Sequence, residues 1–452
     1  MKDSGQTCRV RQDMRRVVGD VAPRPQLCVR AEVEVEGVSV LEWFSRQHGL
    51  DRFYWSGRDG EEEAAGAGIA VQADEVDYST AWEALTAVRR SVDEGPADLR
   101  YYGGMCFDPL DDRTPMEGFG RFRFVAPRLE LRRTGGRTIL ALTEPAGRRS
   151  NIQSLRAEVE ALASEAASLS TDTVALQPVR RILTRVDRPN RNQWTEMVGQ
   201  VMDTMRREGL GKIVLSRKSE LTMSGEVDPA EILRRVRAGR GGTYDFCFES
   251  GGRAFVGSSP ECLYRRRDRE IRTEAMAGTC PIGETDRQTD DLRQALLASA
   301  KEAEEHEYVF QDVRTQLQRI CDRCRVVGER DVLALTYVQH FVSRFEGRLK
   351  AGLATAEVID ALHPTAAVGG YPQAAALEQI RRIERHGRGW YAGPVGWVGR
   401  RADEFAVGIR SCMIEGPRLT LYAGAGIVEA SDAAAEWDET EAKMRHFLEV
   451  LE

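Results

Sequence analysis

The sequence predicts an α+β fold, in which strands joined by turns are covered by helices on the outside. Two observations carry this prediction. Alternating or apolar strand segments follow one another directly, with Gly and Asp turns between them. Amphipathic helical stretches occur between groups of strands and do not alternate regularly with single strands. A doubly wound parallel sheet would require that regular alternation, so it is disfavoured.

The first part of the chain is rich in strands. Alternation is clear in Val33–Glu36 and in Phe122–Val125, within a stretch that runs from about residue 31 to 142. Residues 144–176 are rich in Ala, Ser and Glu with helical spacing, and a polar stretch follows up to about residue 192. We interpret these two segments as the connection between two halves of the fold.

The second part begins with an amphipathic helix after residue 193, which Gly209 is suited to terminate. An apolar strand, Lys212–Ser216, follows at once. Further strands are predicted at residues 254–256, 262–266, 333–338, 341–349, 405–414 and 419–423. Helices are predicted at residues 290–323 and 373–385, and from 433 to the end of the chain.

The predicted organisation is a single integrated domain. Residues 1–30 are polar and Arg-rich, and we expect them to be disordered. Residues 31–185 form the N-terminal strand-rich half, and residues 190–452 form the catalytic region.

Composition excludes several classes of partner. The net charge is −7, from 64 basic and 71 acidic side chains, so neither nucleic acid nor an anionic membrane is expected to bind. Apolar runs long enough to span a membrane and a secretion signal are both lacking, which predicts a cytoplasmic protein. Nine cysteines argue against a disulfide framework. Cys321 and Cys324 form an isolated CxxC within a helical pattern, for which we expect no metal or redox role.

Two pairs of glutamates are the first candidates for chemistry. Glu302 and Glu305 are three residues apart on one predicted helix, and Glu436 and Glu439 are three apart on another. Two such helices could hold one Mg²⁺ ion through oxygen ligands and leave positions for water and a substrate carboxylate. Solvated charged faces would give the same spacing. A di-iron bundle is disfavoured because residue 303 is Ala and the Glu-x-x-His spacing fails.

An acid and a base are the second candidates. Lys212 opens an apolar strand, and Glu261 lies in the turn Gly257–Cys262. A lysine can act as a base where its surroundings favour the neutral amine. Each residue also has an ordinary interpretation, Lys212 as a solubilising strand end and Glu261 as a turn residue.

Glycine-rich segments and an arginine are the third candidates. Ala277–Thr279 and Tyr422–Gly426 could bring backbone N–H groups close to an anion. A dinucleotide fingerprint fails because position 429 is Glu. Arg410 ends a predicted strand and could bind a carboxylate, although an exposed strand end is the commoner case.

Taken together, these segments resemble the chorismate-utilising enzymes, a family that includes isochorismate, salicylate, anthranilate and aminodeoxychorismate synthases. The match is strongest from about residue 190 to 452. The segments that carry it are Gly211–Arg217, Ser259–Leu263, Ala277–Thr279, Glu304–His306, His363–Pro372, Arg388–Trp397, Ile409–Ser411, Ala423–Val428 and Glu436–Thr440. In the first half, Phe53–Ser56 and the following Gly57–Gly60 resemble the N-terminal part of isochorismate synthases in particular.

The resemblance implies a fold of two interleaved α+β halves, with facing antiparallel sheets, outer helices and the active site between the halves. It implies a Mg²⁺ cofactor, with Glu305 and Glu439 as principal ligands and Glu302 and Glu436 in support.

The resemblance also implies how chorismate, the expected small-molecule substrate, is bound. The residues implied for its two carboxylates are Arg410, Lys443 and the backbone of Gly278, Thr279, Gly424 and Gly426. Tyr391 and His340 are similar to residues that line the ring in the family.

The implied reaction is attack of water at C2 with loss of the C4 hydroxyl. Lys212 would be the general base for the water, and a protonated Glu261 the general acid for the departing hydroxyl. Members that use ammonia generally lack the lysine. Salicylate and anthranilate members tend to carry Thr at the position of Ala367, so Ala367 favours release of isochorismate.

The predicted protein is therefore a Mg²⁺-dependent isochorismate synthase, an isomerase expected to serve menaquinone synthesis. Three alternatives are a salicylate synthase, an isochorismate supply for a siderophore, and an inactive chorismate-binding protein. No glutaminase subunit is expected, and we expect a monomer or a weak homodimer.

Overall fold

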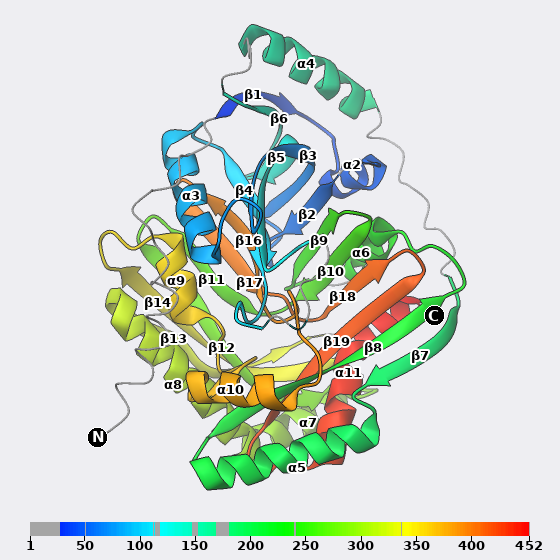
Figure 1. Ribbon diagram of the computed structural model, residues 1–452, viewed down its shortest axis with the longest axis vertical. Coiled ribbons are helices and arrows are strands. Elements are labelled where there is room, and N and C mark those ends of the chain that lie inside the picture. The colour runs from blue at the N-terminus through cyan, green and yellow to red at the C-terminus, as the bar shows by residue number, and fades with distance from the viewer. Residues whose placement is uncertain are drawn as a thin grey trace.

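Two runs of antiparallel strands diverge from one long strand, β5 (Phe122–Thr134), in the computed structural model of the chain (Figure 1). The first half of β5 pairs with β4 and the second half with β6, while β3 lies along its other edge. The described residues are 28–49, 51–111, 113, 118–146, 152–168, 180–238, 241–335 and 337–451.

The strands of the first run pair in a continuous order. They are β1 (Cys28–Val35), β6 (Arg137–Pro145), β5, β3 (Glu62–Asp74), β2 (Arg52–Ser56), β9 (Tyr244–Ser250), β10 (Arg253–Ser259), β18 (Ser411–Glu415), β19 (Arg418–Ile427), β8 (Lys212–Met223) and β7 (Ile182–Arg188). A short strand, β15 (Gly370–Tyr371), also pairs with β8.

The second run starts from the other part of β5. Its strands are β4 (Arg100–Met105), β16 (Pro394–Gly399), β17 (Ala402–Val407), β11 (Cys262–Arg267), β12 (Glu270–Pro281), β14 (Val338–Leu349) and β13 (Cys321–Ala334). Every one of these pairings is antiparallel, which confirms the predicted class.

Apolar side chains from both runs share the same core. Phe53 of the first run stacks on Tyr102 of the second at 4.1 Å between ring centroids. Leu215 in β8 and Ala275 in β12 belong to one buried cluster. The two runs therefore face each other and bury their inner surfaces together, which is the main source of stability in such an architecture.

Helices cover the outside of the strands (Figure 1). They are α2 (Val40–Arg46), α3 (Ala81–Glu94), α4 (Ile152–Ser168), α5 (Arg191–Glu208), α6 (Pro229–Arg237), α7 (Asp286–Ala298), α8 (Ala300–Ile320), α9 (Thr355–Leu362), α10 (Gln373–Ile383) and α11 (Ala433–Leu451). Gly209 ends α5 as expected, with φ 67° in the left-handed region. Helix α8 packs against β12, and α11 packs against β19.

The predicted helix at residues 290–323 was wrong in two respects. It is two helices, α7 and α8, because the chain is extended at Ser299, whose hydroxyl accepts a hydrogen bond from the Glu302 N–H at 3.3 Å. Helix α8 then ends at Ile320, and Cys321 and Cys324 lie in β13, which is held as a strand by pairing with β14.

Three other element predictions also need correction. The segment 405–414 is two strands, because the chain leaves β17 at Val407 and turns at Arg410, where φ is 49°. The segment 333–338 contains only the end of β13 and the first residue of β14. The polar stretch before residue 192 contains β7, which pairs with β8. Residues 1–27 lie outside the described residues, as do the last residues of the connection predicted at 144–176.

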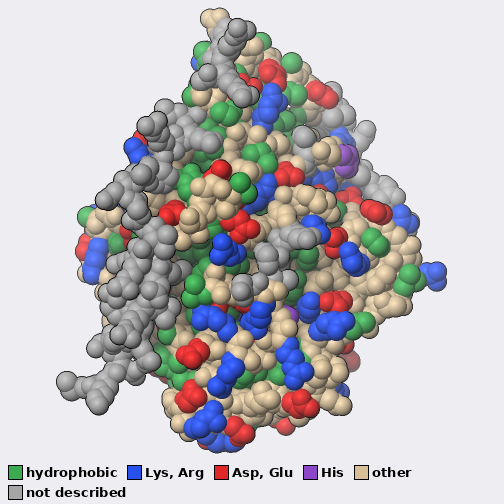
Figure 2. Space-filling model, viewed as in Figure 1, with side chains coloured by type: hydrophobic (Ala, Val, Ile, Leu, Met, Phe, Trp, Pro, Cys, Tyr) green, Lys and Arg blue, Asp and Glu red, His purple; other side chains and the backbone are tan. Residues whose placement is uncertain are grey.

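The surface carries both signs of charge. Figure 2 shows Lys and Arg side chains interspersed with Asp and Glu over the described part of one face. No helix within the described ranges is long and apolar enough to cross a membrane. The eight cysteines in those ranges are all free thiols.

Candidate active site

A cavity lies where β8 and β19 of the first run meet β12 and β14 of the second. Most of the predicted site residues line it: Glu261, Thr279, Glu305, His340, Ala367, Tyr391, Arg410, Gly424, Gly426 and Lys443. Four of the remaining predicted residues contact lining residues: Lys212 pairs with Glu305, Gly278 lies against His340, Glu302 accepts from the Thr279 N–H, and Glu439 pairs with Lys443. The fifth, Glu436, pairs with Lys301, which is not among the lining residues. The fold thus brings together residues that are up to 231 positions apart, from Lys212 to Lys443.

Lys212 is buried beside the cavity and pairs with a glutamate. Its Nζ lies 3.0 Å from Oε1 of Glu305, which comes from α8. A Cβ on residue 426 would lie 2.3 Å from that same Oε1 atom, so only glycine leaves room for the pair. Burial acts to raise the pKa of Glu305, but Lys212, Lys443 and Lys301 together outweigh it, and the net shift is downward. Glu305 therefore stays ionised and can stabilise an ammonium at Lys212.

Glu261 lies in the tight turn between β10 and β11 and faces the same cavity. Its closest side-chain partner is the Thr365 hydroxyl, 3.5 Å from Oε1. Burial, followed by the nearby carboxylate of Glu274, raises the pKa of Glu261 to about 8. A pKa of about 8 leaves this carboxyl protonated at neutral pH, which is the form that can donate a proton.

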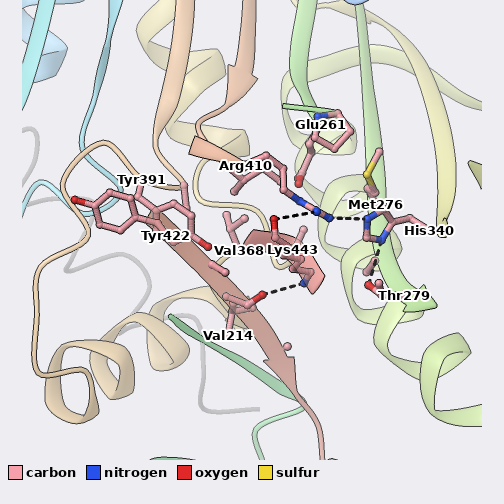
Figure 3. A pocket seen from close by; sticks show the side chains of 18 of the residues that line it. Val214, Glu261, Met276, Thr279, His340, Val368, Tyr391, Arg410, Tyr422 and Lys443 are labelled. Carbon is pink, nitrogen blue, oxygen red and sulfur yellow. Dashed lines mark hydrogen bonds between the residues drawn. The ribbon is translucent and has the colours of Figure 1, made fainter. Parts of the chain in front are cut away.

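Arg410 and His340 form a hydrogen-bonded wall of the cavity (Figure 3). Arg410 Nη2 donates to His340 Nε2 at 3.2 Å, and the other ring nitrogen, Nδ1, lies 3.3 Å from the Gly278 carbonyl and 3.1 Å from the Thr279 hydroxyl. Since a guanidinium only donates, Nε2 accepts and Nδ1 carries the proton. Burial, together with Arg410 and Lys443, lowers the pKa of His340 well below its ordinary value, which keeps the ring neutral.

Lys443 reaches the cavity from α11, one turn after Glu439. Its Nζ donates to the Gly424 carbonyl at 2.9 Å and to Glu439 Oε1 at 2.5 Å. Arg410 Nη1 lies 3.5 Å from the Lys443 carbonyl, so the two cationic side chains enter the cavity close together. Two cations in one enclosed space are suited to an anionic ligand.

The predicted metal ligands make their closest charged contacts with lysines. Lys301 Nζ lies 2.8 Å from Oε1 of Glu436 and 3.3 Å from Oε1 of Glu302, and so links α11 to α8. The other two glutamates, Glu305 and Glu439, pair with Lys212 and Lys443. Isolated charges are costly to bury, so each carboxylate has a cationic neighbour. Sequence reasoning gave no role to Lys301, although it directly precedes Glu302.

The donor set nevertheless suits a hard cation. Burial and the neighbouring Glu439 raise the pKa of Glu436 to about 7. Burial and Glu305 raise the pKa of Glu302. Four carboxylates that repel one another are the oxygen donors that Mg²⁺ prefers. Within the described ranges, no three acidic, His or Cys side chains converge as a finished metal site.

The rest of the cavity wall is largely apolar. Tyr391 stacks on Tyr422 with 5.2 Å between ring centroids and 15° between the planes. Ala367 and Val368 lie along the same cavity, and Figure 3 shows Val368 together with both tyrosines. A flat aromatic and aliphatic surface of this kind suits a small ring. Tyr422 was missed from the sequence as a site residue, although it opens the glycine-rich segment Tyr422–Gly426.

An acid, a lysine and two further cations at or beside one cavity are suited to an enzyme that acts on a small anionic substrate. The family described as chorismate binding enzymes matches residues 19–452, and the chain belongs to this family.

The chain is also similar to individual curated proteins. It is 33% identical over 418 residues to the isochorismate synthase MenF of Escherichia coli, spanning 90% of this chain and 89% of that protein. It is 33% identical over 374 residues to the chloroplastic isochorismate synthase 2 of Arabidopsis thaliana, spanning 81% of this chain and 66% of that protein.

Two solved structures show the same fold. The structure of E. coli MenF, described as the menaquinone-specific isochorismate synthase, matches 99% of this chain at 29% identity with a TM-score of 0.80. Anthranilate synthase component I of Streptococcus pneumoniae matches 96% at 20% identity with a TM-score of 0.70. The predicted arrangement of facing antiparallel sheets with outer helices is thereby confirmed.

Proposed function

We propose that the protein is an isochorismate synthase, which converts chorismate to isochorismate by adding water at C2 and expelling the C4 hydroxyl. The observation that carries this proposal is the presence of buried Lys212 and protonated Glu261 at one cavity. The names of the E. coli and Arabidopsis relatives support the same reaction.

Lys212 and Glu261 each carry out one proton transfer in the proposed reaction. In its neutral amine form, Lys212 accepts a proton from the attacking water, and Glu305, 3.0 Å away, stabilises the ammonium that forms. The ring double bonds shift, and Glu261 donates its proton to the departing hydroxyl. One water enters and one water leaves, so atoms and charge balance. The apolar wall excludes other solvent from the ring.

The substrate is a dicarboxylate, and two cations face the cavity to receive it. Arg410 and Lys443 lie at the wall that also carries His340 and Thr279. We assign the carboxylates of chorismate to these cations and to the backbone near Gly278, Gly424 and Gly426. A neutral His340 adds no charge to this wall and orients the Arg410 guanidinium through its Nε2 atom.

We further propose that the enzyme uses Mg²⁺. Glu305 and Glu439 would be the principal ligands, and Glu302 and Glu436 would support them. When bound, the ion supplies positive charge that lets a substrate carboxylate lie beside the glutamates. The lysines beside these carboxylates support the proposal, because they place positive charge next to each of the four glutamates.

Product chromatography tests the proposed function. Purified protein incubated with chorismate should form isochorismate with Mg²⁺ and form none with a chelator. Salicylate plus pyruvate would assign the protein to the salicylate synthases. Lack of turnover under both conditions would favour a chorismate-binding protein without activity.

Replacing Glu439 by Gln should weaken Mg²⁺ binding by about tenfold or more, because one anionic donor becomes a neutral amide. Isothermal titration with Mg²⁺ alone measures the affinity independently of turnover. Glu449→Gln, on the same helix and bonded to Tyr337, is the matched control and should leave the titration unchanged. Equal affinities for the wild type and Glu439→Gln would remove Glu439 from the ligand set.

Replacing Ala367 by Thr should raise the proportion of pyruvate released by about fivefold. The side chain lines the cavity, and a new hydroxyl there could contribute a hydrogen bond worth about 1 kcal/mol to the elimination. The ratio of pyruvate to isochorismate is measured with Ala374→Thr, on α10, as the control. A ratio identical to that of the wild type would exclude position 367 from product choice.

The proposal extends to the pathway that the enzyme serves and the compartment in which it acts. We propose that it supplies menaquinone synthesis, as the name of the E. coli protein states for that protein. Free thiols at all eight described cysteines suit the reducing cytoplasm, where we expect the enzyme to act. We further expect a monomer or weak homodimer that works without a glutaminase subunit.

A further inference from the structure

The turn that carries Glu261 is held on both sides by one ion pair from distant parts of the chain. Arg58, in the turn after β2, donates from Nη1 to the Pro260 carbonyl at 2.8 Å. Glu274 in β12 accepts at Oε1 from the Cys262 N–H at 2.8 Å. Arg58 and Glu274 bond to each other in a bidentate manner, at 2.6 and 2.9 Å. The peptide groups before and after Glu261 are thus tied to one fixed pair.

The peptide of Glu261 itself is also fixed, whereas its side chain is left for the cavity. Its N–H donates to Ser259 Oγ at 3.3 Å, and its carbonyl accepts from the Val407 N–H at 3.1 Å. Within the described ranges, the hydrogen-bond partner of the carboxyl is the Thr365 hydroxyl, at 3.5 Å. A rigid backbone with a free carboxyl is what a general acid needs, since small displacements of a proton donor cost rate.

We propose that Arg58 and Glu274 are a positioning pair that holds the backbone of Glu261 so that its carboxyl meets the leaving hydroxyl. This inference rests on the proposed function, in which Glu261 is the general acid. Neither Arg58 nor Glu274 is among the residues that line the cavity, so both act through Glu261 and not on the substrate. It also gives a role to the segment Gly57–Gly60, to which no chemistry was assigned from the sequence.

The charges around Glu261 support this role. Glu274 is 3% exposed, and its carboxylate opposes ionisation of Glu261, after burial as the larger cause. Lys212 and Lys443 act in the opposite direction, and the Thr365 hydroxyl favours the ionised form weakly. Removal of the Glu274 charge should therefore let Glu261 ionise at lower pH.

The test is Glu274→Gln, which keeps the shape and one acceptor oxygen but removes the charge. We expect kcat to fall by about tenfold or more while KM for chorismate stays within about twofold. The alkaline limb of the kcat profile should move to lower pH by about one unit, because Glu261 loses a neighbouring anion. Asp403→Asn is the control, because Asp403 forms a similarly buried pair with Arg266 at 2.7 Å on β17 and β11.

A purely structural pair would behave differently. Glu274→Gln would then lower Tm as Asp403→Asn does, with kcat, KM and the alkaline limb unchanged, and the proposal would be overturned. If Glu274→Gln does not fold, the kcat values of Arg58→Lys and Arg58→Met test the proposal instead. A kcat for Arg58→Lys between those of the wild type and Arg58→Met supports positioning. Wild-type kcat in both Arg58 variants overturns it.

Infrared titration separates this inference from the proposed function. The carboxyl band of Glu261, identified by its loss in Glu261→Gln, is followed against pH without substrate. A wild type that does not turn over chorismate would refute the proposed function alone. The band should still titrate at lower pH in Glu274→Gln than in the wild type, and an unchanged titration would overturn the pair's influence on Glu261.

Discussion

Replacing Lys212 by Ala is expected to lower kcat for isochorismate formation by about 10²- to 10⁴-fold, the range that a positioned general base contributes. Lys212 is buried, lies 3.0 Å from Glu305 and opens β8 at the edge of the cavity. Chorismate binding should be nearly unchanged, because the cations assigned to its carboxylates are Arg410 and Lys443. Steady-state kinetics and calorimetric titration with chorismate measure the two effects separately.

Two further variants distinguish the role of Lys212 as a proton acceptor from the effect of its positive charge. Lys212→Arg keeps a cation beside Glu305 but cannot release a proton at neutral pH, so it should be as inactive as Lys212→Ala. Lys218→Ala, further along β8 and paired with Glu220 at 2.8 Å, should retain wild-type activity. If Lys212→Ala loses chorismate binding as well, Lys212 is a substrate contact and not the base.

Replacing Glu261 by Gln is expected to lower kcat by a similar factor of about 10²- to 10⁴-fold, because the amide has the shape of the acid but no proton to give. The wild type should lose activity as pH rises through about 8. Burial raises the pKa of Glu261 to that value, and only the protonated form is active. The residual activity of Glu261→Gln should lack this alkaline limb.

A matched surface carboxylate provides the control for this variant. Glu270, on β12 and paired with Arg348 at 3.2 Å, is 60% exposed at its side chain, and Glu270→Gln should keep both the rate and the pH profile. An alkaline limb that persists unchanged in Glu261→Gln would show that another group supplies the proton.

The sequence alone predicted those features that depend on the spacing of residues along one helix or strand. The i, i+3 glutamates of α8 and α11 lie on one face of each helix wherever those helices sit, so Glu302 with Glu305 and Glu436 with Glu439 could be paired in advance. Strand alternation likewise predicted the α+β class. These features depend on backbone periodicity, which a sequence displays directly.

Features that depend on tertiary contacts were not predicted. Arg58 and Glu274 are 216 residues apart and meet only because the loop after β2 packs against β12. The link that Lys301 makes to Glu436 crosses 135 residues. The break at Ser299 was missed because the helical segments α7 and α8 follow one another with only Ser299 between them. The predicted helix 290–323 included the first residues of β13, whose extended conformation comes from pairing with β14.

The central claim is that solvent water becomes the new hydroxyl of the product, with Lys212 and Glu261 moving the protons. The most direct test is to incubate the protein with chorismate and Mg²⁺ in ¹⁸O-labelled water and to examine the product by mass spectrometry. We predict isochorismate that carries one ¹⁸O atom at the C2 hydroxyl. Isochorismate without label would contradict attack by water, and the absence of isochorismate would contradict the proposed function itself.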